Sequence, residues 1–363
     1  MENIFTIDVH EAFMSRALDL ARMGRGKVSP NPMVGCVLVK DGEIIGEGYH
    51  EEFGGSHAEV SAIKNSRMDP IDAIAYVTME PCCITGKTLP CTETLIHNSI
   101  SEVYIGMLDP NPAINGKGVD ALEKAGISVH LDVMREESEK LNRPFTKWIT
   151  TGTPWVIAKV AQTSDGYMGI DSQTSVWFTG KESKSHSHRL RSTVDAILIG
   201  RQTAEVDNPS LTVREVLGNN PKRVILDTNR TLPLNLKIFQ DHEAETIVFC
   251  SSIRFNRSQT NTCQYIPIKE KNGKLSIDHI LQTLGEEGIT SVLVEGGHEV
   301  LQSFSSADLI DQIYIYTSEH NLDNASLGNP LHLTDEWTIS DEVLLGKDRL
   351  IVAERGVECL QEL

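Results

Sequence analysis

Two short stretches of the 363-residue chain decide what kind of fold and site it can form: GGSHAEV at residues 54–60 and MEPCCITGKTLPC at residues 79–91. A short helix, AEVSAIKN, is predicted to begin at residue 58 within the first stretch, and another, TETLIHNS, directly after the second. AIAYVTME, which runs into the second stretch, has the composition of a buried strand. His57 and the cysteines therefore stand at helix starts and just past a strand end, where α/β folds gather their functional side chains.

Three residues in these stretches offer side chains that bind zinc: His57, Cys82 and Cys91. A catalytic zinc takes three such ligands and keeps one position open for water, whereas a structural zinc takes four. Glu59 stands near enough to His57 to reach that water and carry its proton to a leaving group. His-x-Glu followed by Pro-Cys is the signature of zinc-dependent base deaminases, which continue Cys-x-x-Cys. Thr85 takes the place of that second cysteine here, so Cys91 is the next available thiolate.

Cys83 directly follows Cys82 in the sequence. Side chains of neighbouring residues rarely point into one tetrahedron, so we expect Cys83 to pack beside the site instead of binding the metal. We interpret the cluster as a catalytic zinc site. A structural zinc, and buried thiols without any metal, are the alternatives that the residues leave open.

Three loops carry polar residues that can hold a phosphorylated ligand. Between the two zinc cysteines lies Gly-Lys-Thr, in which Lys87 offers a positive charge to a phosphate. SPNPMVG at residues 29–35 contains Asn31, and DPNPAINGKG at residues 109–118 contains Asp109 and Asn111. Gly-Lys-Thr alone is usually only a turn, so the prediction depends on the three loops occurring together.

The chain divides into two regions of predicted α/β structure, with a boundary near residue 150. In residues 1–150 helices alternate with strands, and Asp-Gly at residues 41–42 predicts a hairpin. A charged helix then runs to Gly152, and the alternation begins again in residues 151–363. Such alternation predicts largely parallel sheets with helices on their faces. The main strands expected in the second region are residues 155–162, 195–200, 223–228, 245–250, 291–297 and 311–317.

Composition excludes several classes of partner. The net charge of −18 offers no counterion to nucleic acid or to an anionic membrane, so we expect neither. The start, MENIFTIDVHE, lacks the basic segment and apolar core of a signal peptide, and no apolar run is long enough to span a bilayer. The seven cysteines are an odd number without an export signal, which favours reduced thiols or metal ligands in the cytoplasm.

Further stretches give the chain a family resemblance. SPNPMVGCVLVKDGEIIGEGYH, HAEV, YVTMEPC and DPNP resemble the first domain of the bifunctional riboflavin-biosynthesis deaminase–reductases, and KVAQTSDG, HRLRSTVDAILIG, TAEVDNPSLTVR and VLVEGG resemble their second domain. In that family eight residues separate the zinc cysteines, as they separate Cys82 and Cys91. The resemblance implies a cytidine-deaminase-like three-layer α/β/α domain in residues 1–150 and a dihydrofolate-reductase-like α/β domain in residues 151–363.

Some positions depart from the residues usual in that family. None of them is a predicted zinc ligand or Glu59, so we expect an effect on substrate contacts and rate only. These positions are Ser56, Ser61, Cys83, Ile84, Leu89 and Tyr167.

The residues of the second region point only faintly to a reductase without the resemblance. There is no G-x-G-x-x-G, but VLVEGGHEVLQSF predicts a strand, two glycines and a helix start that can hold an anionic group, or simply a tight turn. The resemblance implies NADPH as cofactor, at Ala161, Trp177, Thr203, Asp207, Thr228 and Gly297. The substrate positions that it implies are Asn31, His50, Lys87, Asp109 and Asn111 in the first region, and Lys159, Ser175, Arg191, Leu211, Arg214 and Glu295 in the second.

Three of these residues have side chains suited to a specific role. Arg191 and Arg214 can clamp a substrate phosphate. Lys159 lies on the first strand of the second region, where its ammonium can approach the reacting sugar. Buried arginines and a core lysine paired with acids are the structural alternatives.

The resemblance implies two consecutive reactions. A zinc-activated water replaces the amino group at C2 of 2,5-diamino-6-ribosylamino-4(3H)-pyrimidinone 5′-phosphate, with Glu59 moving the proton, and NADPH then reduces the ribosyl group to ribityl. One alternative is a deaminase of a related nucleotide or of nucleic acid with a non-catalytic second domain. Another is a binding protein that keeps the fold. We expect a cytoplasmic homo-oligomer that acts on a phosphorylated pyrimidine.

Overall fold

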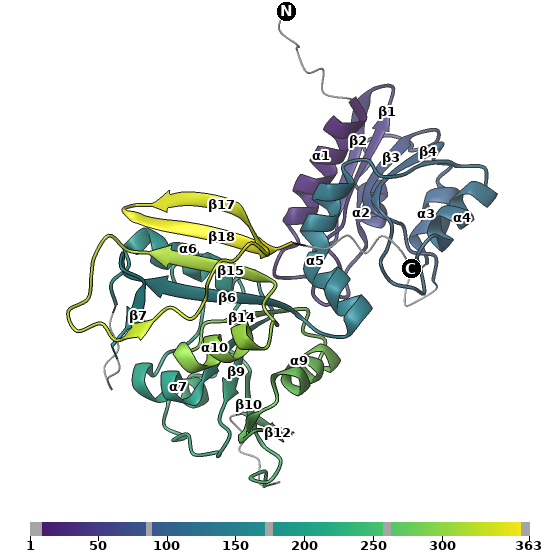
Figure 1. The fold of residues 1–363 in the computed structure, drawn as a ribbon. Helices are drawn as coiled ribbons and strands as arrows, with labels where there is room; N and C mark the ends of the chain where they lie inside the picture. The colour runs from purple at the N-terminus through teal and green to yellow at the C-terminus, as the bar shows by residue number, and fades with distance from the viewer. Residues whose placement is uncertain (1–8, 85–88, 171–176, 257–262, 357–363) are drawn as a thin grey trace, which may run out of the picture. The chain divides into compact units, whose positions relative to one another are not determined.

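The computed structural model describes residues 9–84, 89–170, 177–256 and 263–356. The chain divides into two compact units, residues 1–152 and 153–363 (Figure 1). Each unit has its own sheet and its own hydrophobic core, as expected for a chain too long for one typical core.

The first unit is built on a five-stranded sheet in the order β2-β1-β3-β4-β5. β3, β4 and β5 run parallel, whereas β1 is antiparallel to both β2 and β3. The prediction of a largely parallel sheet is therefore correct for one side only, because β1 and β2 form the hairpin predicted at residues 41–42. The strands are β1 (Gly35–Lys40), β2 (Glu43–Tyr49), β3 (Ile74–Met79), β4 (Glu102–Met107) and β5 (Ser128–His130).

Helices cover both faces of this sheet, which gives the expected three layers (Figure 1). α1 and α5 bury Leu18 and Leu141 against one face. α2, α3 and α4 bury Ala62, Leu95 and Leu122 against the other face. The helices are α1 (Val9–Arg22), α2 (Ala58–Lys64), α3 (Cys91–His97), α4 (Lys117–Lys124) and α5 (Arg135–Thr151).

Two contacts fix the loop that carries Asn31. Gly35 begins β1 so close to α1 that a Cβ there would lie 1.9 Å from the carbonyl oxygen of Ala17, so only glycine fits. From α5, the side-chain amide of Asn142 accepts the Met33 N–H at 2.8 Å and donates to the Met33 carbonyl at 2.9 Å. The loop is thus held by two helices before it reaches the site.

The second unit contains a nine-stranded sheet in the order β11-β10-β9-β8-β14-β6-β15-β18-β17. All neighbours from β11 to β15 are parallel, and β18 and β17 add an antiparallel edge. The strands of this sheet are β6 (Trp155–Gln162), β8 (Ala196–Gly200), β9 (Lys222–Leu226), β10 (Thr246–Ser251), β11 (Gln264–Ile268), β14 (Ser291–Val294), β15 (Gln312–Thr317), β17 (Trp337–Leu345) and β18 (Asp348–Arg355).

Short pairings and helices complete the second unit. β7 (Tyr167–Gly169) pairs with β16 (Leu327–Gly328), and β12 (Glu270–Lys271) pairs with β13 (Lys274–Leu275). The helices are α6 (Lys181–Arg191), α7 (Arg201–Asp207), α8 (Lys237–Gln240), α9 (Ile277–Glu286) and α10 (His298–Ser306). Within the described ranges, no helix combines the length and the apolar character needed to cross a bilayer.

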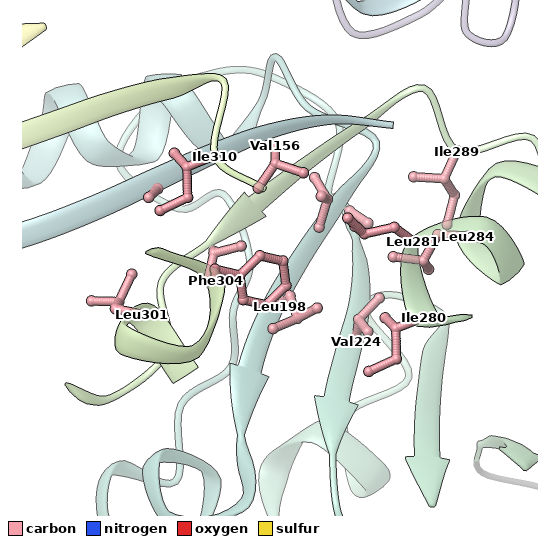
Figure 2. Packing of buried hydrophobic residues seen from close by; sticks show 14 of the residues in the cluster. Val156, Leu198, Val224, Ile280, Leu281, Leu284, Ile289, Leu301, Phe304 and Ile310 are labelled. Atoms are coloured by element: carbon pink, nitrogen blue, oxygen red, sulfur yellow. The ribbon is translucent and has the colours of Figure 1, made fainter. Parts of the chain in front are cut away.

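Figure 2 shows how α9 and α10 pack on one face of this sheet. Leu198 of β8 and Val224 of β9 are buried against Ile280 of α9 and Phe304 of α10. The residues adjacent to these two along the strands point to the opposite face, where Ile199 of β8 and Ile225 of β9 pack with α7 and α8. Both faces of the parallel strands are covered, so functional side chains are left to the carboxyl ends of the strands.

The antiparallel pair of β17 and β18 is absent from the strands that we predict. Trp337–Leu345 mixes half-buried with exposed positions because it lies at the sheet edge, so its hydrophobic pattern is weak. The parallel strands β8, β10 and β14 are buried along their whole length and are therefore easier to predict from composition.

Candidate active sites

His57, Cys82 and Cys91 come together in the first unit. His57 caps the start of α2, Cys91 begins α3, and Cys82 lies in the turn after β3. The ligand atoms of the three residues all lie within 4.8 Å of one another. His57 Nδ1 is 3.2 Å from Cys91 Sγ and 3.6 Å from Cys82 Sγ.

These distances fit one tetrahedral zinc ion. Bond lengths of about 2.0 Å to nitrogen and 2.3 Å to sulfur place the ligand atoms about 3.5 Å apart. Across the residues that the structure describes, this is the one group of three or more His, Cys, Asp or Glu side chains close enough to share a metal. Three ligands leave the fourth position for a reacting water.

Hydrogen bonds hold the two cysteines in place although eight residues separate them. The backbone N–H of Cys91 donates to Cys82 Sγ at 3.4 Å. Thr92 donates to the Cys82 carbonyl from its backbone N–H at 3.2 Å and from its hydroxyl at 3.3 Å. Lys87 lies outside the described residues, and Cys83 is not part of the ligand group.

The surroundings favour a thiolate at Cys82. Hydrogen bonding with Cys91, and then with His57, lowers the pKa of the Cys82 thiol to about 4 although burial opposes this. The proton shared between the two sulfurs stays on Cys91, whose pKa the Cys82 thiolate raises. A soft, negatively charged ligand is therefore available to a metal at neutral pH.

Glu59 lies in the first turn of α2 and is only 3% exposed. Burial raises the pKa of its carboxyl group, and the negative charge of Cys82 raises it further. The carboxylate is hydrogen-bonded to Cys91, so it stands against the metal ligands. A carboxyl group with a raised pKa beside a zinc site can both take up and return a proton.

His50 and Asn31 form a polar pair next to His57. Asn31 Nδ2 donates to His50 Nε2 at 3.0 Å, and His50 Nδ1 donates to the carbonyl of Ser56 at 3.0 Å. Burial lowers the pKa of His50, which agrees with the neutral imidazole that this pattern requires. The rings of His50 and His57 meet edge to face with centroids 5.5 Å apart. Both predicted substrate residues thus lie beside the metal ligands.

Asp109 and Asn111 follow β4, the neighbour of the strand that precedes Cys82. Asp109 is 6% exposed, and its carboxylate accepts the backbone N–H of Asn111 at 2.8 Å. Burial raises the pKa of Asp109 to about 6, with Glu80 and Cys82 adding to the effect. Parallel pairing of β3 and β4 brings this loop to the same edge of the sheet as the zinc ligands.

In the second unit, Arg191 and Glu295 form a buried ion pair. Arg191 Nε and Nη2 donate to the two carboxylate oxygens of Glu295 at 2.9 and 2.7 Å. Burial acts to raise the pKa of Glu295, but Arg191 and then Lys159 lower it overall to about 2. The guanidinium fork that we predict for a substrate phosphate is thus already bound to a carboxylate.

Lys159 lies on β6 beside this ion pair. Burial lowers the pKa of its ammonium, and Glu295 partly opposes that effect. Its Nζ lies 5.5 Å from the ring centroid of Tyr316 on the neighbouring strand β15. The Tyr316 hydroxyl is 2.8 Å from His186 Nδ1. Tyr316 is not predicted from the sequence, because it reaches Lys159 only through the pairing of β15 with β6. His186 is not predicted either, because it contacts Tyr316 from α6.

His188 is a second histidine that sequence analysis misses. It lies one turn before Arg191 on α6, and its Nδ1 accepts the backbone N–H of Arg214 at 3.1 Å. Burial, with Arg191 and Arg214 adding, lowers the pKa of His188 to about 4, so the ring is neutral at pH 7. Arg191 Nη1 also donates to the carbonyl of Thr212 at 3.4 Å. The single signal was the spacing of three residues between His188 and Arg191.

The loop that follows α7 brings Leu211 and Arg214 to Arg191. Leu211 is buried and has a φ of 54°, a left-handed conformation that is uncommon for a leucine. Arg214 is exposed, and its positive charge lies close enough to His188 to help lower the pKa of that ring. Ser175 lies outside the described residues.

Four of the predicted cofactor residues, Thr203, Asp207, Thr228 and Gly297, lie in segments that follow the carboxyl ends of parallel strands. Thr203 Oγ1 accepts the N–H of Gly297, which links α7 after β8 to the start of α10 after β14, at 3.0 Å. A Cβ on Gly296 would meet Val300 at 2.8 Å, so the backbone there is open only because glycine occupies it. A helix start with glycine before it suits a phosphate group. The remaining predicted positions are Ala161 on β6, Asp207 at the end of α7, Thr228 after β9 and the 65% exposed Trp177.

The fold and the ligand group together define a cytidine-deaminase-like domain joined to a second, reductase-like α/β domain. Residues 7–107 match the family model of the cytidine and deoxycytidylate deaminase zinc-binding region. Residues 154–318 match that of the RibD C-terminal domain. The fold class predicted from the sequence is confirmed.

The chain belongs to the riboflavin biosynthesis protein RibD family of bifunctional deaminase–reductases. It is 39% identical to the RibD protein of Aquifex aeolicus, over 85% of this chain and 86% of that one. It is 37% identical to that of Actinobacillus pleuropneumoniae, over 84% and 82%. The crystal structure of a Thermotoga maritima diaminohydroxyphosphoribosylaminopyrimidine deaminase/5-amino-6-(5-phosphoribosylamino)uracil reductase is 36% identical, with a TM-score of 0.87 over 96% of this chain and 99% of that one. The predicted resemblance is thereby confirmed.

Proposed function

We propose that this enzyme of riboflavin biosynthesis depends on zinc for its deaminase reaction and on NADPH for its reductase reaction. The first half hydrolyses the C2 amino group of 2,5-diamino-6-ribosylamino-4(3H)-pyrimidinone 5′-phosphate, and the second half reduces the ribosyl group to ribityl. The observation that carries the proposal is the approach of His57, Cys82 and Cys91 to within 4.8 Å, with the buried Glu59 beside them.

In the deaminase reaction the chain's own residues move protons and orient the base. Zinc held by the three ligands supplies a Lewis acid that makes a water nucleophilic near neutral pH. Glu59 takes a proton from that water and returns it to the amino group, which leaves as ammonia. Asn31, held by His50, and the loop with Asp109 orient the pyrimidine against the site.

In the reductase reaction the chain's residues orient the sugar and supply a proton. NADPH provides the hydride for C1′ of the ring-opened ribosyl group. Lys159 can give a proton to the sugar oxygen, because burial weakens its hold on that proton. Arg191 is already paired with Glu295, so we assign the substrate phosphate to Arg214, which is exposed and bonds His188 through its backbone N–H.

Three further properties complete the proposal: a phosphorylated small-molecule substrate, a cytoplasmic location and a homo-oligomeric state. None of the six cysteines in the described part of the chain forms a disulfide, which agrees with a reducing compartment. The net charge of −18 argues against nucleic acid as the substrate, and no observation favours a non-catalytic second half.

The test is removal and return of the metal, with the two reactions assayed separately. A strong chelator should abolish ammonia release from the diaminopyrimidine phosphate, and added zinc should restore it. NADPH oxidation with the already deaminated substrate should continue in the chelated enzyme. Deamination that persists in zinc-free protein would refute the proposed role of the metal.

A further inference from the structure

Glu80 is a buried carboxylate that the deaminase reaction as described does not use. It directly follows β3 and is 4% exposed. One carboxylate oxygen accepts the backbone N–H of Asp109 at 3.1 Å and that of Gly116 at 3.0 Å. The other accepts those of Gly118 at 2.8 Å and Val119 at 3.3 Å. A single side chain thus accepts hydrogen bonds from four backbone N–H groups of one segment of the chain.

That segment, residues 109–119, has little regular structure until α4 begins. Inside it, Asn111 N–H donates to the Asp109 carboxylate at 2.8 Å, and Asn115 Nδ2 donates to the Asp109 carbonyl at 2.9 Å. These local bonds shape the loop but do not attach it to β3. Glu80 makes that attachment, and it binds both the start of the loop at Asp109 and its end at Gly118.

The start of α4 packs very closely against the residues that follow β3. A Cβ on Gly118 would lie 2.2 Å from the carbonyl oxygen of Pro81 and 2.9 Å from Glu80 Oε1. The first turn of α4 therefore packs directly against the Pro81 carbonyl and the Glu80 side chain, just before the proposed metal ligand Cys82. The unpaired N–H groups of a helix start also favour a negative charge at this point.

We propose that Glu80 is a positioning residue for deamination: it holds the 109–119 segment at a fixed distance from the metal ligands, so that Asp109 and Asn111 meet the pyrimidine. The proposal rests on the proposed function, because it assumes that this segment contacts the substrate. A carboxylate suits the task because its two oxygens accept several N–H groups at once. A purely structural Glu80 would stabilise the unit without changing how the folded, zinc-loaded enzyme binds substrate.

Glu80→Gln tests the proposal at nearly constant volume. The amide replaces one acceptor oxygen with an NH₂ group, which faces N–H donors and cannot accept from them. Glu80→Asp keeps the charge but shortens the reach, and serves as the second variant if the first folds poorly. Asp120→Asn is the matched control, because it removes an exposed carboxylate from the first turn of the same helix.

Two properties of each variant are measured: its deamination kinetics, normalised to bound zinc, and the hydrogen exchange of its backbone amides. In Glu80→Gln the KM for deamination should rise about ten- to a hundredfold with kcat little changed, since contacts that bind ground and transition states alike act on KM. Glu80→Asp should show a smaller rise of the same kind. Hydrogen exchange of the amides of residues 109–119 should accelerate in both variants without substrate. Asp120→Asn should match wild type in KM and exchange.

The results that would refute the role of Glu80 differ from those that would refute the proposed function. If KM per zinc-loaded enzyme stays at the wild-type value in both Glu80 variants, or if only kcat falls, Glu80 does not position the substrate. Unchanged exchange would show that Glu80 does not hold the segment at all, and that measurement needs no substrate. A wild-type enzyme that fails to deaminate the pyrimidine would instead refute the proposed function.

Discussion

The two units build their sites in different ways. In the first unit the proposed metal ligands and Glu59 come from two short stretches, at the starts of α2 and α3 and in the turn after β3. In the second unit Lys159, Arg191 and Glu295 come singly from β6, from the last residue of α6 and from the end of β14. The residues of the first site are therefore close together in the sequence, whereas those of the second meet only after β6 has paired with β14 and β15.

Because the two sites are built differently, we expect the loss of one residue to affect them differently. A metal centre of three ligands fails completely when one ligand is lost, because the remaining two cannot hold zinc in place. The charged cluster of the second unit has a different weakness, since its ions are buried and each depends on the other for compensation. The variants below test whether the two halves respond in these separate ways, beginning with the largest expected effect.

Loss of a metal ligand should have the largest effect. Cys91→Ser should reduce zinc content from about one ion per chain to almost none, and deamination should fall to background. Cys83→Ser is the matched control, because Cys83 is a neighbouring half-buried thiol outside the ligand group, and it should retain the metal. Elemental analysis of both proteins measures this. Zinc retained by Cys91→Ser but lost by Cys83→Ser would reverse the ligand assignment.

Breaking the buried ion pair should come next, and should affect only the second unit. Glu295→Gln leaves the guanidinium of Arg191 without its counter-charge, which costs about 3–5 kcal/mol in buried pairs. The Arg191 and Glu295 side chains are 13% and 8% exposed. The measurement is urea unfolding of the full chain, followed by hydrogen exchange of amides in β6 and β14. The exposed pair of Arg349 and Glu342 provides the control, and Glu342→Gln should leave the second unit nearly unchanged.

The stability difference between wild type and Glu295→Gln should become smaller at low pH. The folded pKa of Glu295 is lowered to about 2, so its contribution is fully present above its unfolded pKa of about 4.3 and is lost as pH falls toward 2. The gap in stability between wild type and Glu295→Gln should therefore narrow from pH 5 downward. A gap that stays constant down to pH 2.5 would show that the carboxylate charge is not what stabilises the unit.

The smallest effect is expected at His188. Its Nδ1 accepts the Arg214 N–H, and asparagine places an oxygen near the Nδ1 position, whereas glutamine carries its oxygen farther out. His188→Asn should keep NADPH-dependent reduction close to wild type, and His188→Gln should lose about two- to tenfold in kcat/KM, the value of one neutral hydrogen bond. Deamination should be unchanged in both. Equal losses in the two variants would mean that the Nδ1 contact is unimportant.

Much of the first site could be predicted from sequence because its parts are close together in the chain. His57 and Glu59 share one helix start, and Cys82 and Cys91 flank one short loop, so spacing alone limits the geometry. Local spacing does not predict the role of Glu80. Its partners lie 29 to 39 residues later, and nothing in Met-Glu-Pro-Cys predicts that the glutamate turns toward α4 instead of toward the metal.

The second site was predicted from the family resemblance and only faintly from its residues. Lys159 and Tyr316 meet because β6 pairs with β15, and Arg191 meets Glu295 from 104 residues away. A hydrophobic pattern predicts that these strands exist but not which of them are neighbours. For the same reason the sequence could not predict that Glu295 binds the guanidinium group of Arg191 through both carboxylate oxygens.

The central claim is that two separate sites carry two separate reactions, and Glu59→Gln tests it most directly. Ammonia release from the diaminopyrimidine phosphate and NADPH oxidation with the deaminated product should be measured on the same zinc-loaded preparation. We predict that deamination falls about 10²–10⁴-fold, as expected when a proton carrier is removed, while reduction proceeds at the wild-type rate. Equal loss of both reactions, or deamination at the wild-type rate, would contradict the account.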